Sequence, residues 1–247
     1  MLWSHLPADE FHINLALNTE LPIGCNNEDI FHFMEVLQRS FPQMQQFVAN
    51  DSPEWIRVLE EDRETPCNRW ISVEKTSVSA GYCNPELAKD AYDLHRRVLE
   101  LAPTLLGISL INLRAVDLIF AFDMIYDGNH DEIVSKVFAP SGFDQMIDSA
   151  EGSIVNFEPN LTFALDEASE LQGRISIETR TNGGTGLDHR FGESRITVIL
   201  TIRKYWSSKD GELTLTYSKL KEIGERLVEK KVVPLILTPL AEVIASR

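Results

Sequence analysis

Cysteine is scarce in this sequence. The three cysteines, Cys25, Cys67 and Cys83, are far apart, and none belongs to a Cys-x-x-Cys pair. An odd number with such spacing excludes a disulfide framework and a zinc ribbon, and it is typical of a protein in a reducing cytoplasm. We interpret the cysteines as structural or incidental residues because none carries the local signature of a nucleophile. No metal and no cofactor are expected.

Long apolar runs are also missing. The most apolar stretch, residues 105–126, is interrupted by Asn112, Arg114, Asp117 and Asp123, so it indicates a buried strand and not a membrane span. The first ten residues lack the basic region and the apolar core of a signal peptide. We therefore expect a cytoplasmic protein that does not bind membranes.

Positive charge is in short supply. Lys and Arg number 23 against 38 Asp and Glu, which gives a formal net charge of -15. Such a charge opposes binding to nucleic-acid phosphates and favours a cationic partner. The densest basic groups are pairs only, Arg203 with Lys204 and Lys230 with Lys231. Nucleic acid is therefore not an expected partner.

Motifs of well-known catalytic sites are absent. The sequence has neither a Gly-x-Ser-x-Gly elbow nor a His-Glu-x-x-His pair. Its glycine-rich segment, residues 182–186, leads into an expected strand, whereas a phosphate-binding loop leads into a helix. We interpret this segment, with His189 close by, as a hairpin tip, and a loop that closes on a ligand remains the alternative.

The most regular pattern in the chain is a strand over residues 113–126. Its even-numbered side chains are large and apolar, and its odd-numbered side chains are smaller and include Asp117 and Asp123. Since side chains alternate along a strand, we expect the large ones to face helices and the two aspartates to face away from them.

The remaining patterns predict a mixture of strands and helices. Helices are expected after the caps Asn26, Asn84 and Asn129, with Pro85 at a first helical position and Pro103 as a stop. A last helix is expected to end before Pro234. Further strands are expected at residues 11–18, 55–59, 70–78, 161–165, 174–180 and 195–206.

The two halves of the sequence resemble each other. Adding 103 to the residue numbers places Ile13 on Val116, Leu15 on Leu118, Leu17 on Phe120 and Asn26 on Asn129. Offsets of 104 and 129 align later segments in the same order. We interpret this as an internal duplication, although chance matches between two α+β segments remain an alternative.

The expected fold is therefore α+β, with a tandem pseudo-repeat of two lobes. Each lobe has a mostly antiparallel sheet of about four strands with two helices on one face, in the order β-α-β-β-(β)-α. The first lobe covers residues 1–107, and the second covers residues 108–247 with a longer hairpin around 181–195. A groove between such lobes is the default place for a ligand.

Six side chains are candidates for that groove. Each also has a plain structural interpretation, because aspartates occupy exposed sheet faces and helix starts, and tryptophans fill cores. A structure in which these side chains converge in one pocket would favour a ligand-binding or catalytic site, and one in which they point apart would favour structural roles. The candidates are Asp117, Asp123, His130, His189, Trp70 and Trp206.

The function that these patterns favour is an acidic cytoplasmic binding protein. Its expected partner is a basic or partly unfolded protein, in an adaptor, immunity or chaperone-like role. The alternative is a small-molecule-binding protein or a hydrolytic enzyme with its site in the groove. Catalysis is the less favoured hypothesis because no catalytic motif is present.

Overall fold

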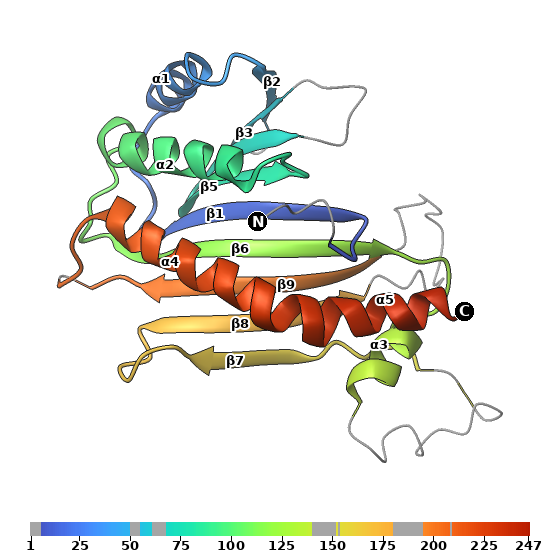
Figure 1. Ribbon diagram of the computed structural model, residues 1–247. Helices are drawn as coiled ribbons and strands as arrows, with labels where there is room; N and C mark the ends of the chain where they lie inside the picture. Colours follow the sequence, from blue (N-terminus) through green and yellow to red (C-terminus); the bar gives the residue numbers. More distant parts are fainter. Residues whose placement is uncertain are drawn as a thin grey trace.

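The computed structural model is built on one antiparallel sheet of nine strands (Figure 1). It describes residues 6–49, 55–60, 68–139, 152, 154–179, 195–207 and 209–247. The α+β class expected from the sequence is confirmed. The two halves of the chain do not form separate sheets, because their strands join in one continuous sheet.

The order of the strands in the sheet is β2-β3-β4-β5-β1-β6-β9-β8-β7. Read across the sheet from one edge strand to the other, the first five strands come from the first half of the chain, and the last four come from the second half. The bounds are β1 (Glu10–Thr19), β2 (Met44–Ala49), β3 (Trp55–Glu60), β4 (Arg69–Glu74), β5 (Ser77–Cys83), β6 (Leu113–Ile125), β7 (Asn160–Ala164), β8 (Leu171–Thr179) and β9 (Arg195–Tyr205).

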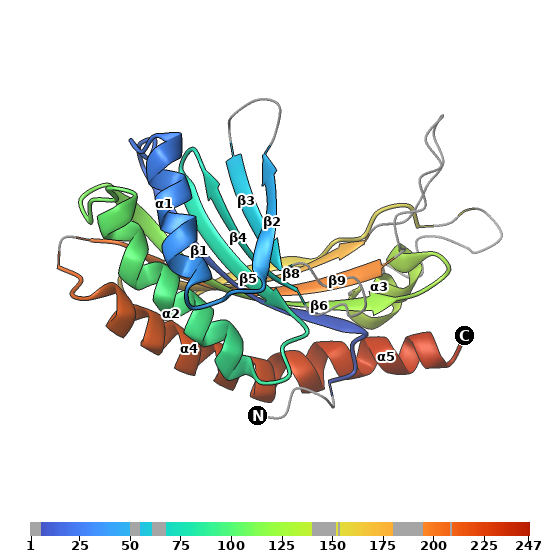
Figure 2. The same ribbon diagram turned by 90° about the horizontal axis from the view of Figure 1, so that it is seen from above.

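The helices gather on one side of the sheet. Figure 2 shows a strongly curved sheet with α1, α2, α4 and α5 along its convex side. The helical segments are α1 (Asn27–Gln38), α2 (Ala88–Leu105), α3 (His130–Phe138), α4 (Leu213–Leu227), a π-helical segment (Val228–Leu237) and α5 (Thr238–Ala245). In the described part of the chain, no helix is both long and apolar enough to cross a membrane.

The core lies between the sheet and these helices. Leu15 of β1 and Leu118 and Phe120 of β6 are completely buried. Gly224 of α4 lies directly on Phe120, which shows that the large side chains of β6 face the helices as expected. Burial of each such side chain contributes about 1.5–3 kcal/mol.

The two halves meet through β1 and β6. These strands pair antiparallel, with Leu15 opposite Leu118, Ile13 opposite Phe120 and Leu17 opposite Val116. The first strand of each half therefore lies at the centre of the sheet.

Two of the expected helix caps are confirmed. Asn26 and Asp29 form a reciprocal capping box at the start of α1. The Asn129 side chain accepts a hydrogen bond from the backbone N–H of Glu132 at the start of α3. Both motifs depend only on residues three positions apart, which is why the sequence predicts them well.

The expected start of α2 is wrong. Asn84 has a left-handed backbone with φ of 47°, and its side chain accepts a hydrogen bond from the backbone N–H of Phe11 at 2.8 Å. An N-cap needs an extended backbone, so the helix begins later, at Ala88. The contact that decides this comes from β1, far away in the sequence.

Neither proline ends its helix where expected. Pro103 lies inside α2, which continues to Leu105 and closes with a bond from the Leu106 N–H to the Ala102 carbonyl. Pro234 lies inside the π-helical segment. The wider π turn relieves the clash that a proline makes in an α-helix with the carbonyl four residues earlier.

Two strand assignments also change. The expected strand 70–78 is two strands, β4 and β5, that pair with each other across a turn at residues 75–76. Strand β2 at the edge of the sheet was not expected at all. Its Gln45 and Gln46 are exposed, and an edge strand with few buried side chains lacks the apolar alternation that marks a strand in a sequence. The expected hairpin around 181–195 lies largely outside the described residues.

Candidate functional site

The side of the sheet away from the helices carries polar side chains. We call it the polar face and define it by the side chains of the central strands that point away from the helices. In β1 these are even-numbered residues, and in β6 and β9 they are odd-numbered, because paired strands keep partners on the same side. Its members include His12, Asn14, Asn18, Asp117, Asp123, Arg195, Thr197 and Arg203.

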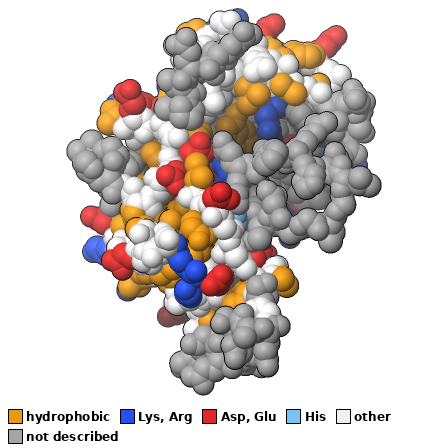
Figure 3. All heavy atoms as spheres, turned by 90° about the vertical axis from the view of Figure 1, so that its right-hand side faces the viewer, with side chains coloured by type: hydrophobic (Ala, Val, Ile, Leu, Met, Phe, Trp, Pro, Cys, Tyr) orange, Lys and Arg blue, Asp and Glu red, His pale blue; other side chains and the backbone are white. Residues whose placement is uncertain are grey.

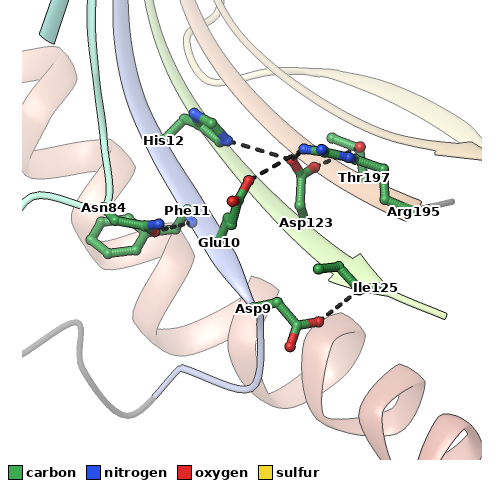
Figure 4. Close-up of polar contacts among 9 residues, drawn as sticks. All are labelled: Asp9, Glu10, Phe11, His12, Asn84, Asp123, Ile125, Arg195 and Thr197. Atoms are coloured by element: carbon green, nitrogen blue, oxygen red, sulfur yellow. Dashed lines mark hydrogen bonds and ion pairs between the residues drawn. The ribbon is translucent and has the colours of Figure 1, made fainter. Parts of the chain in front are cut away.

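Asp123 is the centre of a charged cluster at one end of the polar face (Figure 4). Its carboxylate accepts hydrogen bonds from Arg195 Nη1 at 2.6 Å and from Thr197 Oγ1 at 2.6 Å. The Nε2 atom of His12 lies 3.4 Å from Asp123 Oδ2. Only 4% of Asp123 is exposed, so a carboxylate here requires these partners.

These contacts shift the pKa values of both partners. Burial would lower the pKa of His12, but its contacts with Asp123 and Cys83 raise it to about 9. Burial would likewise raise the pKa of Asp123, but the contacts with His12, Thr197 and Arg195 lower it to about 2. At neutral pH the two side chains therefore form an ion pair.

Two further side chains complete the cluster. Cys83 lies directly opposite His12 in the pairing of β5 with β1. Glu10 lies two residues before His12 on the same side of β1, and its Oε2 is 3.3 Å from Arg195 Nη1. The ligand atoms of Glu10, His12 and Cys83 all lie within 4.8 Å of one another. We call Glu10, His12, Cys83, Asp123, Arg195 and Thr197 the His12 cluster.

Asp117 belongs to a second network at the other end of β6. Arg203 binds its carboxylate with two nitrogens, Nε at 2.7 Å and Nη2 at 2.6 Å. The side-chain amide of Asn18 donates a further bond at 3.1 Å. The bond with Asp117 raises the pKa of Arg203 above its usual value. Asp117 and Asp123 thus have different partners and do not form one acidic site.

Trp70 lies on the same side of the sheet, on β4. It covers Gly81 of β5, where a Cβ atom would come within 2.6 Å of the indole ring. The Arg57 guanidinium is 5.3 Å from the centre of the indole. Glycine at position 81 therefore creates the space for this tryptophan, and the pair extends the polar face toward β3.

The other candidates lie elsewhere. His130 is fully buried on α3, where its Nε2 is 2.8 Å from the Tyr126 carbonyl oxygen. Trp206 follows β9 and lines a cavity of about 270 Å³ with Leu110 and Ile111. His189 lies outside the described residues.

Comparison of the chain with known protein families gives no match. Comparison with curated protein sequences gives none either.

The His12 cluster brings Asp123 together with two residues that sequence reasoning missed. In the sequence, His12 lies within the strand expected at residues 11–18, and Cys83 is one of three widely spaced cysteines. The signal that joins them is the register of β1 with β5 and β6, which no local pattern contains. A carboxylate, an imidazole and a thiol in contact can serve as metal ligands or can activate the thiol.

Proposed function

We propose that this protein is a binding protein that holds a protein partner against the polar face. The observation that carries the proposal is the position of the helices. They lie along the convex side of a curved sheet, whereas the polar face is on the concave side (Figure 2). A concave sheet with fixed polar side chains offers a rigid surface for a partner.

The charges of this face support a partner held by specific contacts. Arg195 and Arg203 are each paired with a buried aspartate, so their positions are fixed before a partner arrives. Side chains of both signs are interspersed with hydrophobic ones on the side of the molecule that Figure 3 shows. The net charge of -15 then acts at longer range and draws in a basic or partly unfolded protein. We place this binding in the reducing cytoplasm.

The proposal includes the two-lobe organisation, with lobes 1–107 and 108–247. Under an offset of 103, Leu15 corresponds to Leu118, and these two residues face each other in the sheet. The pairs on either side, Ile13 with Phe120 and Leu17 with Val116, are those that a two-fold axis between two copies requires. The register thereby supports a duplication, with the axis passing between the two leucines.

The helices add to this support. Tyr92 of α2 and Tyr217 of α4 pack edge to face with their ring centres 6.5 Å apart. An offset of 125 relates the two tyrosines and also relates the first residues of the two helices, Ala88 and Leu213. It differs by four residues, about one helical turn, from the offset of 129 that aligns these segments in the sequence. Equivalent helices that cross at equivalent residues are expected near a two-fold axis.

The test is affinity capture combined with a matched pair of variants. Thr201→Arg adds a large cation to the polar face in the middle of β9, and Ser218→Arg adds the same cation to the exposed side of α4. We expect the wild type and Ser218→Arg to recover the same partner from extracts of the source cell at low salt. Thr201→Arg should lose it.

Two results would contradict the proposal. One is the absence of any partner at low salt, and the other is equal recovery by Thr201→Arg and the wild type. Crosslinking of the recovered complex adds a direct readout, because the crosslinks should map to the polar strands and not to α2 or α4.

A further inference from the structure

Three metal-ligating side chains of different chemistry meet within the His12 cluster. Glu10 and His12 come from β1, and Cys83 comes from β5. A carboxylate oxygen, an imidazole nitrogen and a thiol sulfur lie within 4.8 Å of one another. Four-coordinate zinc holds its ligand atoms about 3.5 Å apart. Side-chain rotations that move each ligand atom by about 1 Å would therefore bring the three atoms to the distances of a zinc site.

The neighbours of these ligands favour a metal-binding arrangement. Asp123 contacts His12 through Nε2, which leaves Nδ1 as the ring nitrogen for a metal. A carboxylate on the second nitrogen of a ligating histidine fixes the ring and strengthens the metal bond. Arg195 contacts Oε2 of Glu10, so Oε1 is the oxygen left to bind. Arg195 also bonds Asp123, which anchors both carboxylates in place.

We propose that Glu10, His12 and Cys83 bind a divalent transition-metal ion of the zinc class. Asp123 and Arg195 position the ligands. Three protein ligands leave a fourth coordination position for water or another ligand. This inference does not depend on the proposed protein partner, because the ligands all come from this chain.

The donor set selects the class of ion. A thiolate and an imidazole suit zinc and its neighbours, whereas calcium and magnesium prefer oxygen ligands. The ligand atoms must lose their protons to bind, so the metal displaces the proton of the Cys83 thiol and the proton on Nδ1 of His12. Nε2 of His12 keeps its proton and donates it to Asp123. The 71 positions between His12 and Cys83 explain why no metal motif is visible in the sequence.

The experiment uses the reduced full-length protein and Co²⁺ as a spectroscopic probe. Cobalt bound to a thiolate gives a charge-transfer band in the near ultraviolet, and four-coordinate cobalt gives strong visible bands. We expect both to saturate at one equivalent and to vanish when Zn²⁺ is added. Zn²⁺ should also raise the midpoint of thermal unfolding.

Three variants distinguish Co²⁺ bound at Glu10, His12 and Cys83 from Co²⁺ bound elsewhere on the protein. Cys83→Ser should abolish the charge-transfer band, and Asp123→Asn should weaken Co²⁺ affinity about tenfold, as expected for a residue that orients a ligand. Cys25→Ser is the matched control, because Cys25 is also a partly buried free cysteine but lies outside the cluster. Its spectrum and its affinity should equal those of the wild type. Circular dichroism checks that each variant is folded.

Three results would overturn the inference. They are a wild-type protein with no thiolate band at saturating Co²⁺, a band that survives Cys83→Ser, and a band that is lost in Cys25→Ser. The shift in unfolding temperature gives a second criterion, since a Zn²⁺ shift of equal size in a folded Cys83→Ser variant would also contradict the site.

Discussion

Asp117 and Arg203 show what an ion pair with a buried carboxylate contributes in this sheet. Asp117 is 3% exposed, and Arg203 meets it with two nitrogens. Loss of Arg203 leaves the buried carboxylate of Asp117 without its cation, and an unpaired buried charge typically costs about 3–5 kcal/mol. Loss of Asp117 should cost less, because the Arg203 side chain is 38% exposed and water can solvate it. Exposed pairs usually contribute below about 1 kcal/mol.

A double-mutant cycle with Asp117→Ala and Arg203→Ala tests this difference. We expect Arg203→Ala to lower the free energy of unfolding by about 2–4 kcal/mol and Asp117→Ala to lower it by less, with a coupling energy of about 1–3 kcal/mol. The control is the pair Asp93 and Arg96 on α2, whose atoms are 2.8 Å apart but whose side chains are 38% and 60% exposed. Its coupling should stay below about 0.5 kcal/mol. Equal coupling in both cycles would contradict the role of burial.

His95 predicts a loss of stability in mild acid. It is fully buried between the sheet and α4, where its Nδ1 is 2.7 Å from the Tyr217 hydroxyl. Burial lowers its pKa from 6.5 to about 3, although contacts with the backbone of Ile13 and Ala80 act in the opposite direction. The neutral ring therefore stabilises the fold above pH 6.5. That contribution decreases as pH falls toward 3, because only the unfolded chain takes up the proton.

Urea unfolding at pH 7 and pH 5 measures this effect. Because of His95, we expect the free energy of unfolding to be about 2 kcal/mol lower at pH 5 than at pH 7, since each pH unit below 6.5 contributes about 1.4 kcal/mol. The His95→Gln variant has no histidine at this position to take up the proton. From pH 7 to pH 5 its free energy of unfolding should therefore fall by about 2 kcal/mol less than that of the wild type. His32→Gln is the control for the substitution itself, because it makes the same exchange at an exposed position on α1. Equal pH dependence in wild type and His95→Gln would contradict the prediction.

Residue patterns predicted the side of the sheet on which a group lies, but not its partner. The alternation of residues 113–126 placed Asp117 and Asp123 away from the helices, as the structure shows. Their partners Arg203 and Arg195 are 86 and 72 positions away. Only the pairing of β6 with β9 brings them together, and no local rule encodes that pairing.

At the scale of elements, α4 depends on one glycine where it crosses the sheet. Gly224 lies on Phe120, and a Cβ atom there would come within 2.4 Å of the ring. Phe120 is completely buried, and side chains in a close-packed core can move little without disturbing their neighbours. A glycine in mid-helix is otherwise unfavourable by about 1 kcal/mol relative to alanine, which indicates that close packing determines this position.

Gly224→Ala should therefore destabilise the protein even though alanine favours a helix. We expect a loss of about 1–3 kcal/mol from overpacking, measured by chemical unfolding. Gly211→Ala is the matched control, since nothing lies within 4 Å of a Cβ atom at that position. It should change the stability by less than about 0.5 kcal/mol. A Gly224→Ala variant more stable than the wild type would show that α4 can move away from the sheet.

Elements with local determinants were predictable, and those fixed by distant contacts were not. The caps of α1 and α3 follow from Asn26 and Asn129 with nearby residues. The start of α2 depends on the bond between Asn84 and Phe11, 73 positions apart. The prediction that the last helix ends before Pro234 was wrong because a rare π-helical segment accommodates this proline.

At the scale of the whole molecule, the two halves of the chain share one sheet and one core. The sequence predicted the repeated order of elements, but it did not show that β1 and β6 would join the halves. Leu15 and Leu118 meet at that junction, and both are completely buried. A junction made of core residues couples the folding of the two halves.

Cooperative unfolding tests this coupling. We expect hydrogen exchange, followed by mass spectrometry at increasing denaturant, to give the same global opening free energy for β5 in one half and β9 in the other. Leu118→Ala should lower both values equally, by about 3–5 kcal/mol, because it leaves a cavity at the junction. Leu215→Ala is the control, since Leu215 is 61% exposed on α4 and its truncation should have little effect. If Leu118→Ala instead lowers the value for β9 and leaves that for β5 unchanged, the halves fold independently, and the polar face is a surface between two separable lobes.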